Sequence, residues 1–403
     1  PMSTDAAVPP EVSHLILLFT LFVLPRVLQR FRLPPGVTSV ALGAALGLGL
    51  GWFEQDPTIH LLATFGIVSL FLFAGLEVDF LELWHEIRIL LQHVVLGLLA
   101  LGLGTLVIRW TLGLEPRAAT LLALGLLTPS TGFILDSLPG WGLSEQQRFW
   151  VKSKAIASEL VALGALFVVT QSQSLSGLAT STLVLLALVA ILPLAFRWFA
   201  AVVLPYAPKS EFAFLLMVAV FAALVTRRLG IYYLVGAFIV GAAAQRFRKR
   251  LPTMASEQML HAVEVFASVF IPFYFFSTGL GLRAADFSLP ALELGGAFLL
   301  VALPFRVALV ATHRRFALRE EAGTAIRVGV AMVPTLVFGL VIAELLRDSY
   351  GISSRVFGGL LIYTLANTLL PGFLLGRAPH EAVGTEAGEP AAAQVARPAQ
   401  PTP

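Results

Sequence analysis

Two charged residues of this chain fall well inside long apolar segments, where a charge is costly. Glu159 lies in the segment 149–170 and Arg306 lies in the segment 291–312. A charged side chain near the middle of a membrane span costs roughly 2.5–3.5 kcal/mol on insertion scales and marks a functional group by default. Glu159 is therefore the candidate for binding an ion or a proton, with a paired structural acid as the alternative. Arg306 is the candidate for charge compensation, with a fixed partner of helix ends as the alternative.

Two prolines in the middle of other apolar segments point to the same chemistry. Proline removes a backbone N–H and frees a carbonyl, which a membrane tolerates only where protein or water satisfies the freed groups. Paired breaks of this kind expose oxygens that suit a small cation, whereas simple kinks are the alternative. The helix-break residues are Pro129, Pro334 and Thr335. The expected ion and proton ligands are Glu159, Ser158, Thr131, Ser130 and Thr128, with Glu159 and Ser158 as the metal ligands for Na⁺ or K⁺.

These groups stand out because charge is scarce in the whole chain. Its 403 residues are 57% hydrophobic and 13% charged, whereas soluble domains hold about 45–50% apolar and about 25% charged residues. This composition excludes a soluble domain and a disordered chain, and it predicts an all-α polytopic membrane protein. The absence of cysteine excludes thiolate chemistry. The histidines are scattered, and no catalytic triad or phosphate loop stands out, so we expect neither an enzyme nor a cofactor. The basic residues report orientation, and we expect no nucleic-acid partner.

The elements that must position these residues are apolar segments near the length of about 20 residues that a span needs. Thirteen are predicted, at residues 15–28, 35–52, 60–78, 84–111, 118–138, 149–170, 178–204, 211–227, 231–245, 261–282, 291–312, 325–346 and 356–375. Gly43, Gly47 and Gly51 have a spacing typical of helix packing. We therefore expect a transmembrane domain at 1–376. Residues 377–403, rich in Ala, Pro, Gly and Glu, are predicted to form a disordered cytoplasmic tail.

Short motifs recur in the two halves of the chain at similar offsets. The matched pairs are Arg32-Leu33-Pro34-Pro35 with Arg228-Leu229-Gly230, Phe73 to Leu76 with Ser277 to Leu280, and Pro129 with Pro334. Because the partners lie seven spans apart, an odd number, the halves must face opposite ways, as in the inverted repeats of transporters. The predicted repeats are about 15–170 and 211–375, joined by a linker helix at about 178–204. Arginine and lysine gather in alternate loops, which places the N-terminus outside and the C-terminus in the cytoplasm.

Three motifs resemble those of a known family. Phe71 to Asp79 (FLFAGLEVD) is similar to the third-span signature of bacterial monovalent cation:proton antiporters of the Kef and NapA type. Phe275 to Leu280 (FFSTGL) resembles their FF-small-x-GL element. Arg327 to Met332, with Gly339 to Val341, resembles their penultimate broken helix. The similarity runs from about residue 15 to 375, nearly the whole chain.

The resemblance implies the sodium/proton antiporter fold, with about 13 transmembrane helices in inverted repeats and two crossed broken helices beside an acidic pair on the sixth span. It also implies a dimerisation domain, a mobile core domain and a homodimer in the bacterial inner membrane, in contact with lipid. Ser158 and Glu159 fall where the family usually has Asp-Asp, Asn-Asp or Gln-Asp, and Arg306 falls where electrogenic members usually have Lys. Serine does not titrate and arginine does not deprotonate. We therefore predict electroneutral exchange of one proton for one Na⁺ or K⁺, and the resemblance implies elevator-type alternating access.

Two other functions remain open from the sequence. The first is a solute:sodium symporter of the bile-acid-transporter type, which also uses crossed broken helices but needs a wide polar cavity. The second is a transport-dead sensor or channel-like homologue, because Ser-Glu replaces the usual acidic pair. The sequence does not choose between Na⁺ and K⁺, since selectivity depends on the geometry of the oxygen ligands.

Overall fold

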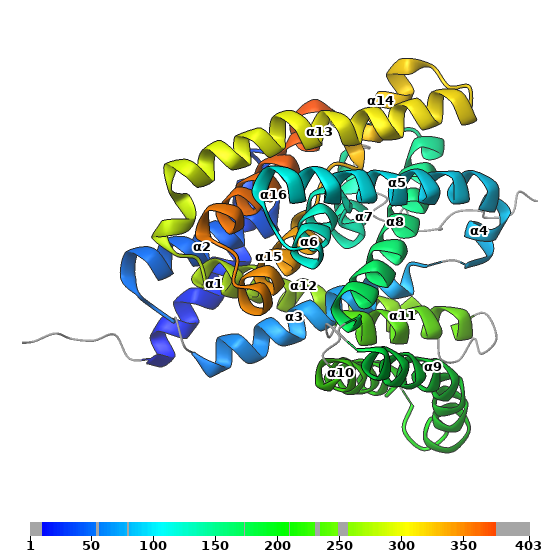
Figure 1. Cartoon of the computed structure of the whole chain (residues 1–403). Helices are drawn as coiled ribbons and strands as arrows, with labels where there is room; N and C mark the ends of the chain where they lie inside the picture. Colours follow the sequence, from blue (N-terminus) through cyan, green and yellow to red (C-terminus); the bar gives the residue numbers. More distant parts are fainter. Residues whose placement is uncertain are drawn as a thin grey trace, which may run out of the picture.

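The computed structural model describes residues 10–53, 56–78, 80–172, 174–208, 210–229, 234–248 and 257–375, and its regular elements in these ranges are helices. In chain order (Figure 1) the α-helices are α1 (Pro10–Gln29), α2 (Pro35–Leu50), α3 (Pro57–Leu76), α4 (Phe80–His85), α5 (Ile87–Leu112), α6 (Pro116–Leu127), α7 (Thr131–Ser137), α8 (Glu145–Gln171), α9 (Leu175–Trp198), α10 (Glu211–Arg228), α11 (Leu234–Arg248), α12 (Glu257–Leu280), α13 (Leu289–Ala317), α14 (Ala322–Ala331), α15 (Leu336–Tyr350) and α16 (Ser354–Leu374). The tail predicted at 377–403 lies outside the described residues.

Residues at the helix ends explain where several of these elements start and stop. Proline has a fixed φ and no N–H to leave unpaired, so it suits the first turn; α2, α3 and α6 begin at Pro35, Pro57 and Pro116. Glycine tolerates a positive φ and therefore ends helices; α2, α5 and α15 stop at Gly51, Gly113 and Gly351. Ser144 begins α8 with a capping box in which its hydroxyl and the Gln147 side chain each bind the other's backbone N–H. Residues with local capping or turn preferences therefore set the ends of these helices.

The helices long and apolar enough to cross a membrane number nine among the described residues, or up to ten if the bent pair α14–α15 is one span. Two of the remaining predicted segments correspond to shorter apolar helices, α2 and α11. A third corresponds to α10, which carries Glu211, Arg227 and Arg228 near its ends. Each of the thirteen predicted segments therefore has a helical counterpart, but the length and hydropathy of the helices support a lower count. The count of thirteen spans stays a prediction.

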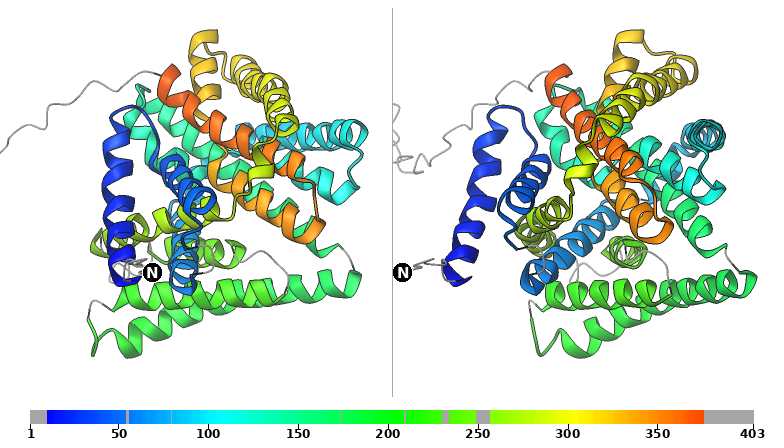
Figure 2. Two further views of the ribbon diagram at one scale, coloured as in Figure 1. Left: turned by 90° about the vertical axis from the view of Figure 1, so that its left-hand side faces the viewer. Right: turned by 60° about the vertical axis from the view of Figure 1, so that its left-hand side comes forward.

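The helices pack in two sets with few contacts between them. The scaffold set comprises α1–α3 and α9–α12, in which α12 packs on α2 and α3, and α11 packs on α3, α9 and α10. The core set comprises α5–α8 and α13–α16, in which α13 packs on α14 and α16, and α6 packs on α5 and α15. The main contacts between the sets join α3 to α7 and α8 to α9. Figures 1 and 2 place α9 and α10 along one edge of the molecule, away from α13 and α16.

Two glycine pairs let helices of the scaffold set cross in backbone contact. Gly43 of α2 meets Gly279 of α12, and Gly75 of α3 meets Gly241 of α11. A Cβ built on any of these four residues lies 3.0 Å from the Cα of its partner and closer still to other backbone atoms. Small residues are the usual means by which membrane helices approach closely. The packing role predicted for Gly43 is confirmed, whereas Gly51 ends α2 at a φ of 63°.

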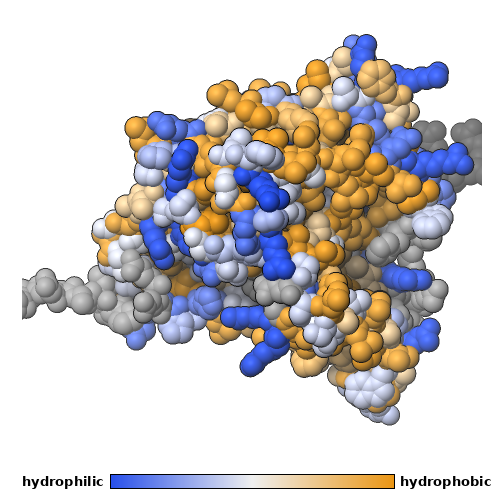
Figure 3. All heavy atoms as spheres, in the orientation of Figure 1, coloured by the Kyte–Doolittle hydropathy of each residue, from blue (hydrophilic) through white to orange (hydrophobic). Residues whose placement is uncertain are grey.

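The face of the bundle in Figure 3 carries a broad apolar area on its right-hand side, next to a mixed polar area in the centre and on the left. Large hydrophobic side chains project from α5, α9 and α13, for example Trp110 at 85%, Leu183 at 68% and Leu300 at 79% exposure. Contiguous exposed apolar area of this extent marks a surface that another apolar phase covers. Together with the length and hydropathy of the helices, this surface describes a multi-pass membrane protein, as the composition predicted.

Candidate functional site

The first helix break separates α6 from α7 at Thr128, Pro129 and Ser130. The proline cannot donate to the preceding turn, and Ser130 adopts an extended conformation with φ −93° and ψ 96° before α7 begins. Thr128 and Ser130 are both buried, at 5% and 1% exposure. The break thus places hydroxyl groups and freed backbone groups inside the core set.

The second break separates α14 from α15 and bends the chain by 48°. It lies against the first break, because the Ser130 N–H donates to the Pro334 carbonyl at 2.8 Å and the Val337 N–H donates to the Ser130 hydroxyl at 3.2 Å. One backbone N–H and one backbone carbonyl therefore satisfy each other across the two breaks, and the Ser130 hydroxyl satisfies a second N–H. The predicted pair Pro129 and Pro334 meets in space, more than 200 residues apart in sequence.

Glu159 of α8 lies beside the start of α7. Its side chain is 3% exposed, and its Oε2 accepts a hydrogen bond from the Thr131 backbone N–H at 3.1 Å. The Thr131 hydroxyl is buried close to the same carboxylate and makes no hydrogen bond of normal geometry within the described part of the chain. A buried carboxylate and an uncommitted hydroxyl are oxygen ligands that a small cation accepts. The structure therefore brings Glu159, Thr131 and Ser130 to one place, as the sequence predicted.

Arg306 of α13 is 6% exposed and binds the second break. Its Nη1 donates to the Val333 carbonyl at 2.6 Å and to the Tyr363 hydroxyl at 3.1 Å, and its Nη2 donates to the Met332 carbonyl at 2.9 Å. The Tyr363 hydroxyl in turn donates to the Leu126 carbonyl at the end of α6, at 2.8 Å. The Arg306 guanidinium thus compensates carbonyls at the end of α14. This is the role of a fixed partner of helix ends, which the sequence analysis gave as the alternative for Arg306.

Thr335, the remaining helix-break residue, is fully buried and bound by an amide side chain. Its N–H donates to Asn367 Oδ1 at 3.1 Å, and Asn367 Nδ2 donates to the Thr335 hydroxyl at 2.9 Å. Asn367 lies on α16 and is fully buried. The Thr335 hydroxyl therefore already has a partner, unlike that of Thr131.

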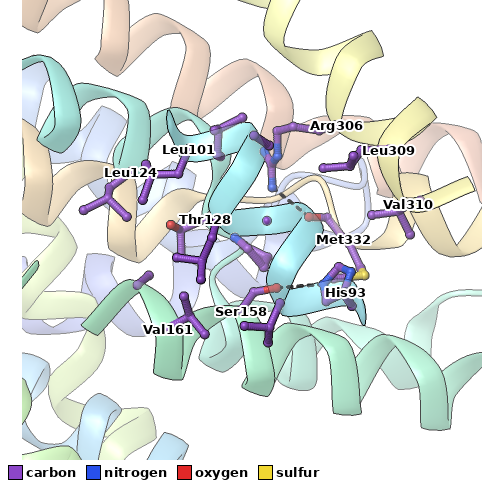
Figure 4. Close-up of a pocket in the computed structure, with 18 residues that line it drawn as sticks. His93, Leu101, Leu124, Thr128, Ser158, Val161, Arg306, Leu309, Val310 and Met332 are labelled. Atoms are coloured by element: carbon purple, nitrogen blue, oxygen red, sulfur yellow. Dashed lines mark hydrogen bonds between the residues drawn. The ribbon is translucent and has the colours of Figure 1, made fainter. Parts of the chain in front are cut away.

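Ser158 adjoins Glu159 in sequence but faces another side of α8, because successive helical residues are about 100° apart. Its hydroxyl pairs with His93 Nε2 at 2.9 Å. Both line a cavity of about 80 Å³ that Arg306, Thr128 and Pro129 also line (Figure 4). The structure thus separates the two predicted metal ligands, with Glu159 at the start of α7 and Ser158 in the cavity.

A family model described as "Sodium/hydrogen exchanger, transmembrane" matches residues 16–378, most of the chain. The chain belongs to this family. The sodium/hydrogen exchangers are transporters of monovalent cations and protons, not enzymes, which confirms the resemblance seen in the sequence.

Curated relatives of this exchanger carry both sodium and potassium names. It is 28% identical over 354 residues to "Probable Na(+)/H(+) antiporter 3" of Methanocaldococcus jannaschii, covering 85% of this chain and 89% of the relative. It is 26% identical over 388 residues to "Putative K(+) efflux antiporter KefB" of Alkalimonas amylolytica, covering 90% of this chain and 56% of the relative. A third relative, "Na(+)/H(+) antiporter NhaS5" of Synechocystis, is 26% identical over 69% of this chain and 40% of its own length. The chain thus spans about half the length of the last two relatives.

Solved structures resemble the exchanger over nearly its whole length. The sodium proton antiporter MjNhaP1 from Methanocaldococcus jannaschii at pH 8 superposes with a TM-score of 0.63 at 13% identity, covering 90% of this chain and 95% of that one. An electron-microscopy structure of the same antiporter gives a TM-score of 0.64. At this identity the likeness establishes a shared fold.

The sequence of the exchanger gave no prediction for three residues of the site. Tyr363 and Asn367 are polar groups inside a predicted span, so the rule that singled out Glu159 could have found them. His93 is one of several histidines scattered along the sequence, yet its ring lies 5.9 Å from that of His313. That contact joins helices far apart in the chain, and no spacing in the sequence indicates it.

Proposed function

We propose that this exchanger moves one monovalent cation, Na⁺ or K⁺, in exchange for one proton, and that both compete for Glu159. The observation that carries the proposal is the position of the Glu159 carboxylate, buried beside two helix breaks that are hydrogen-bonded to each other. A carboxylate is needed in both half-cycles, because it binds a proton as an acid and a cation as a base. Membership of the sodium/hydrogen exchanger family supports the same reaction.

The ligand set that we propose for the cation is Glu159 with oxygens of the first break. Thr131 contributes a hydroxyl that makes no other hydrogen bond in the described structure. Ser130 and Thr128 are buried next to it. Ser158 is proposed as a ligand only for a cation that lies in the cavity beside it. Its hydroxyl is already paired with His93. The relatives named as Na⁺ and as K⁺ antiporters support either cation.

The proposed stoichiometry is electroneutral. Arg306 remains charged at all working pH values, and its donors are bound to Met332, Val333 and Tyr363. Ser158 carries no charge to exchange. Among the described residues at the helix breaks, Glu159 is then the group that alternates between a proton and a cation, so each cycle moves one positive charge in each direction.

Inverted repeats and elevator-type movement belong to the same proposal. In the proposed repeat, α2 corresponds to α11, and α3 corresponds to α12. The crossing of α2 with α12 then corresponds to the crossing of α3 with α11. Glycine pairs at both crossings support this relation. The sparse contacts between the scaffold set and the core set support a core that moves as a unit. A homodimer in the bacterial inner membrane, with the N-terminus outside, completes the proposal.

The test is transport by the purified full chain in proteoliposomes. A pH gradient is formed, and its collapse on addition of Na⁺, K⁺, Li⁺ or Rb⁺ is followed by dequenching of a pH-sensitive dye, with and without a clamped membrane potential. We expect wild-type protein to respond to at least one cation at a rate independent of the potential. Glu159→Gln keeps the shape of the side chain but removes the charge, so its rate falls to that of protein-free liposomes.

Glu145→Gln is the matched control, because Glu145 lies on the same helix in its exposed first turn. It is expected to transport like the wild type. Full cation-driven proton movement by Glu159→Gln contradicts the assignment of the site. A potential-dependent rate contradicts the electroneutral stoichiometry, and uptake of labelled organic solutes in place of exchange favours a solute:sodium symporter.

A further inference from the structure

A groove lined by apolar side chains lies between three helices of the core set, α5, α6 and α13, which pack on one another. Its volume is about 400 Å³, and none of the proposed cation ligands lines it. The lining residues of α5 fall between Leu103 and Leu112, and those of α6 between Ala123 and Leu127. This space is called the apolar groove below. Its lining residues on α13 share one face of that helix: Leu294, Ala297, Phe298, Val301, Ala302 and Phe305.

Small residues give the apolar groove its width. Gly104 of α5, Ala123 of α6 and Ala302 of α13 all line it. A Cβ built on Gly104 lies 3.4 Å from Leu127 Cδ1 and 3.6 Å from the Ala123 Cβ, which are ordinary contacts between lining residues. A larger side chain at Gly104 would therefore extend into the groove without displacing the backbone.

The apolar groove opens on the outer surface of the bundle. Leu103, Val107 and Val301 at its edge are 54%, 49% and 69% exposed. Ile108 and Leu126 on its inner side are buried. Because exposed apolar side chains of a membrane protein face the hydrocarbon of the bilayer, the groove is open to lipid chains.

The chemistry of the lining selects an apolar occupant. Thr111 is the one lining residue with a polar side chain, and its hydroxyl already donates to the Val107 carbonyl at 2.8 Å. A buried water makes about two to four hydrogen bonds to polar groups, which these side chains do not supply. A hydrocarbon chain needs no such partner and gains dispersion contacts with the apolar lining. The apolar groove therefore suits the acyl chain of a lipid.

The length of the apolar groove matches one leaflet of a bilayer. From Leu294 to Phe305 it follows α13 for about 16 Å, at about 1.5 Å per residue. Half of the hydrocarbon core of a bilayer is about 15 Å thick. Arg109 and Trp110 are exposed in the last turn of α5, beside the groove. Tryptophan gathers at the membrane–water interface, and a guanidinium binds phosphate, so a phospholipid can place its phosphate near Arg109 and one chain in the groove.

The apolar groove reaches the first helix break from behind. The carbonyl of Leu126, a lining residue, accepts a hydrogen bond from the Tyr363 hydroxyl at 2.8 Å. The ring of Phe298, another lining residue, meets the Tyr363 ring edge-on with the centroids 6.4 Å apart. Because the three helices of the groove all belong to the core set, an occupant would stay with the core and support the packing behind the break.

We propose that the apolar groove binds one acyl chain of a phospholipid whose phosphate lies near Arg109, and that this lipid is held as part of the core set. The groove contains no proposed cation ligand, so the proposal does not depend on the exchange proposed at Glu159. A chain between three helices makes more contacts with the protein than a lipid that lies against one helix face. This lipid is therefore expected to stay bound when the protein is extracted in a mild detergent.

The test is native mass spectrometry of the full chain extracted from membranes, which counts the retained lipids and identifies them by mass. Gly104→Leu and Ala302→Leu each place a branched side chain in the groove, from different helices. Gly102→Leu is the matched control, because Gly102 is exposed on α5, does not line the groove, and a Cβ built on it meets no neighbouring atom within 4 Å. We expect the wild type and Gly102→Leu to retain one phospholipid more than the two groove variants.

Thermal unfolding in detergent gives a second readout. Dioleoyl phosphatidylglycerol added to delipidated protein is expected to raise the unfolding midpoint of the wild type and of Gly102→Leu by a few degrees, since a ligand that binds the folded state stabilises it. The midpoints of Gly104→Leu and Ala302→Leu should shift by less than half as much. Gly102→Leu and Gly104→Leu make the same change in helix propensity, so a difference between their responses reports on the groove.

An equal lipid count in all four proteins overturns the proposal, and so does loss of the lipid from Gly102→Leu. An extra adduct with the mass of the detergent overturns the assignment of a phospholipid. A dimer without a lipid adduct, disrupted only by the groove variants, shows that a second copy of the chain occupies the groove instead. If one groove variant does not fold, the other carries the same test from the opposite wall.

Discussion

The two helix breaks are built alike but are held by opposite charges. Each break has an N–H at the start of its second half and carbonyls at the end of its first half. At the first break the N–H of Thr131 binds the Glu159 carboxylate, and the Leu126 carbonyl binds the neutral Tyr363 hydroxyl. At the second break the N–H of Thr335 binds the neutral Asn367 amide. Its carbonyls, from Met332 and Val333, bind Arg306.

This difference supports the proposal that the exchangeable site lies at the first of the two breaks. Only the N–H end of the first break faces a group that can lose a proton and accept a cation. The N–H end of the second faces an amide, which does neither. Arg306 keeps a permanent charge at the second break, so in the proposed mechanism that break supports the first and does not itself exchange ions.

The largest effect on stability and transport is expected from removing the Arg306 guanidinium at the second break. Arg306→Ala leaves at least two carbonyls without a charged donor, and each such loss costs about 1.5–3 kcal/mol. The thermal unfolding midpoint in detergent should fall strongly, and transport should be lost. Arg306→Lys, which keeps the charge with fewer donors, should recover part of both. Arg355→Ala, an exposed arginine in the first turn of α16, serves as the control, and equal stability of Arg306→Ala and this control would refute the comparison.

A smaller effect is expected from the neutral partner of the second break. Asn367→Ala leaves the buried N–H of Thr335 unpaired, which costs about 1–3 kcal/mol. We expect a lower unfolding midpoint and slower transport with an unchanged cation concentration at half-maximal rate. If that concentration rises many-fold while stability is retained, Asn367 is itself a cation ligand and the two breaks are more alike than described.

The smallest change in stability, with a change in affinity, is expected at the first break. The Thr131 hydroxyl has no hydrogen bond in the described structure, so Thr131→Val should leave the unfolding midpoint nearly unchanged. It removes a proposed ligand oxygen, so the half-maximal cation concentration should rise several-fold. Thr335→Val is the matched variant at the second break and should do the reverse, with a loss of about 1 kcal/mol and unchanged affinity. If the two variants change stability and cation affinity in the same way, the first break is not distinguished as the one that binds the cation.

The sequence predicted the chemical groups of the site better than their contacts. Glu159, Arg306, Pro129 and Pro334 were found because a charge or a proline within hydrocarbon is costly and must be compensated. That reasoning identifies a residue without saying which neighbour compensates it. Asn367 lies in a predicted span and is polar, so the same reasoning applies to it, although an uncharged amide is a weaker signal than a charge.

Other features depend on helix rotation and on contacts between distant helices, which local sequence does not encode. Ser158 and Glu159 are neighbours in sequence, but the rotation of α8 gives them different partners. His93 and His313 belong to helices more than 200 residues apart. Hydropathy does not fix the number of spans either, because α10 is apolar in its middle and charged at its ends. The all-helical fold, in contrast, follows directly from composition.

The glycine crossings of the scaffold set also constrain how sequence change is tolerated. Where backbones touch at Gly43 with Gly279 and at Gly75 with Gly241, even a single added methyl group would push the main chain of a neighbouring helix aside. These close backbone crossings support a scaffold set that keeps its shape in the proposed elevator-type movement. In a library of single substitutions, these four glycines should be as intolerant as Glu159, whereas lipid-facing positions such as Leu300 should accept most apolar residues.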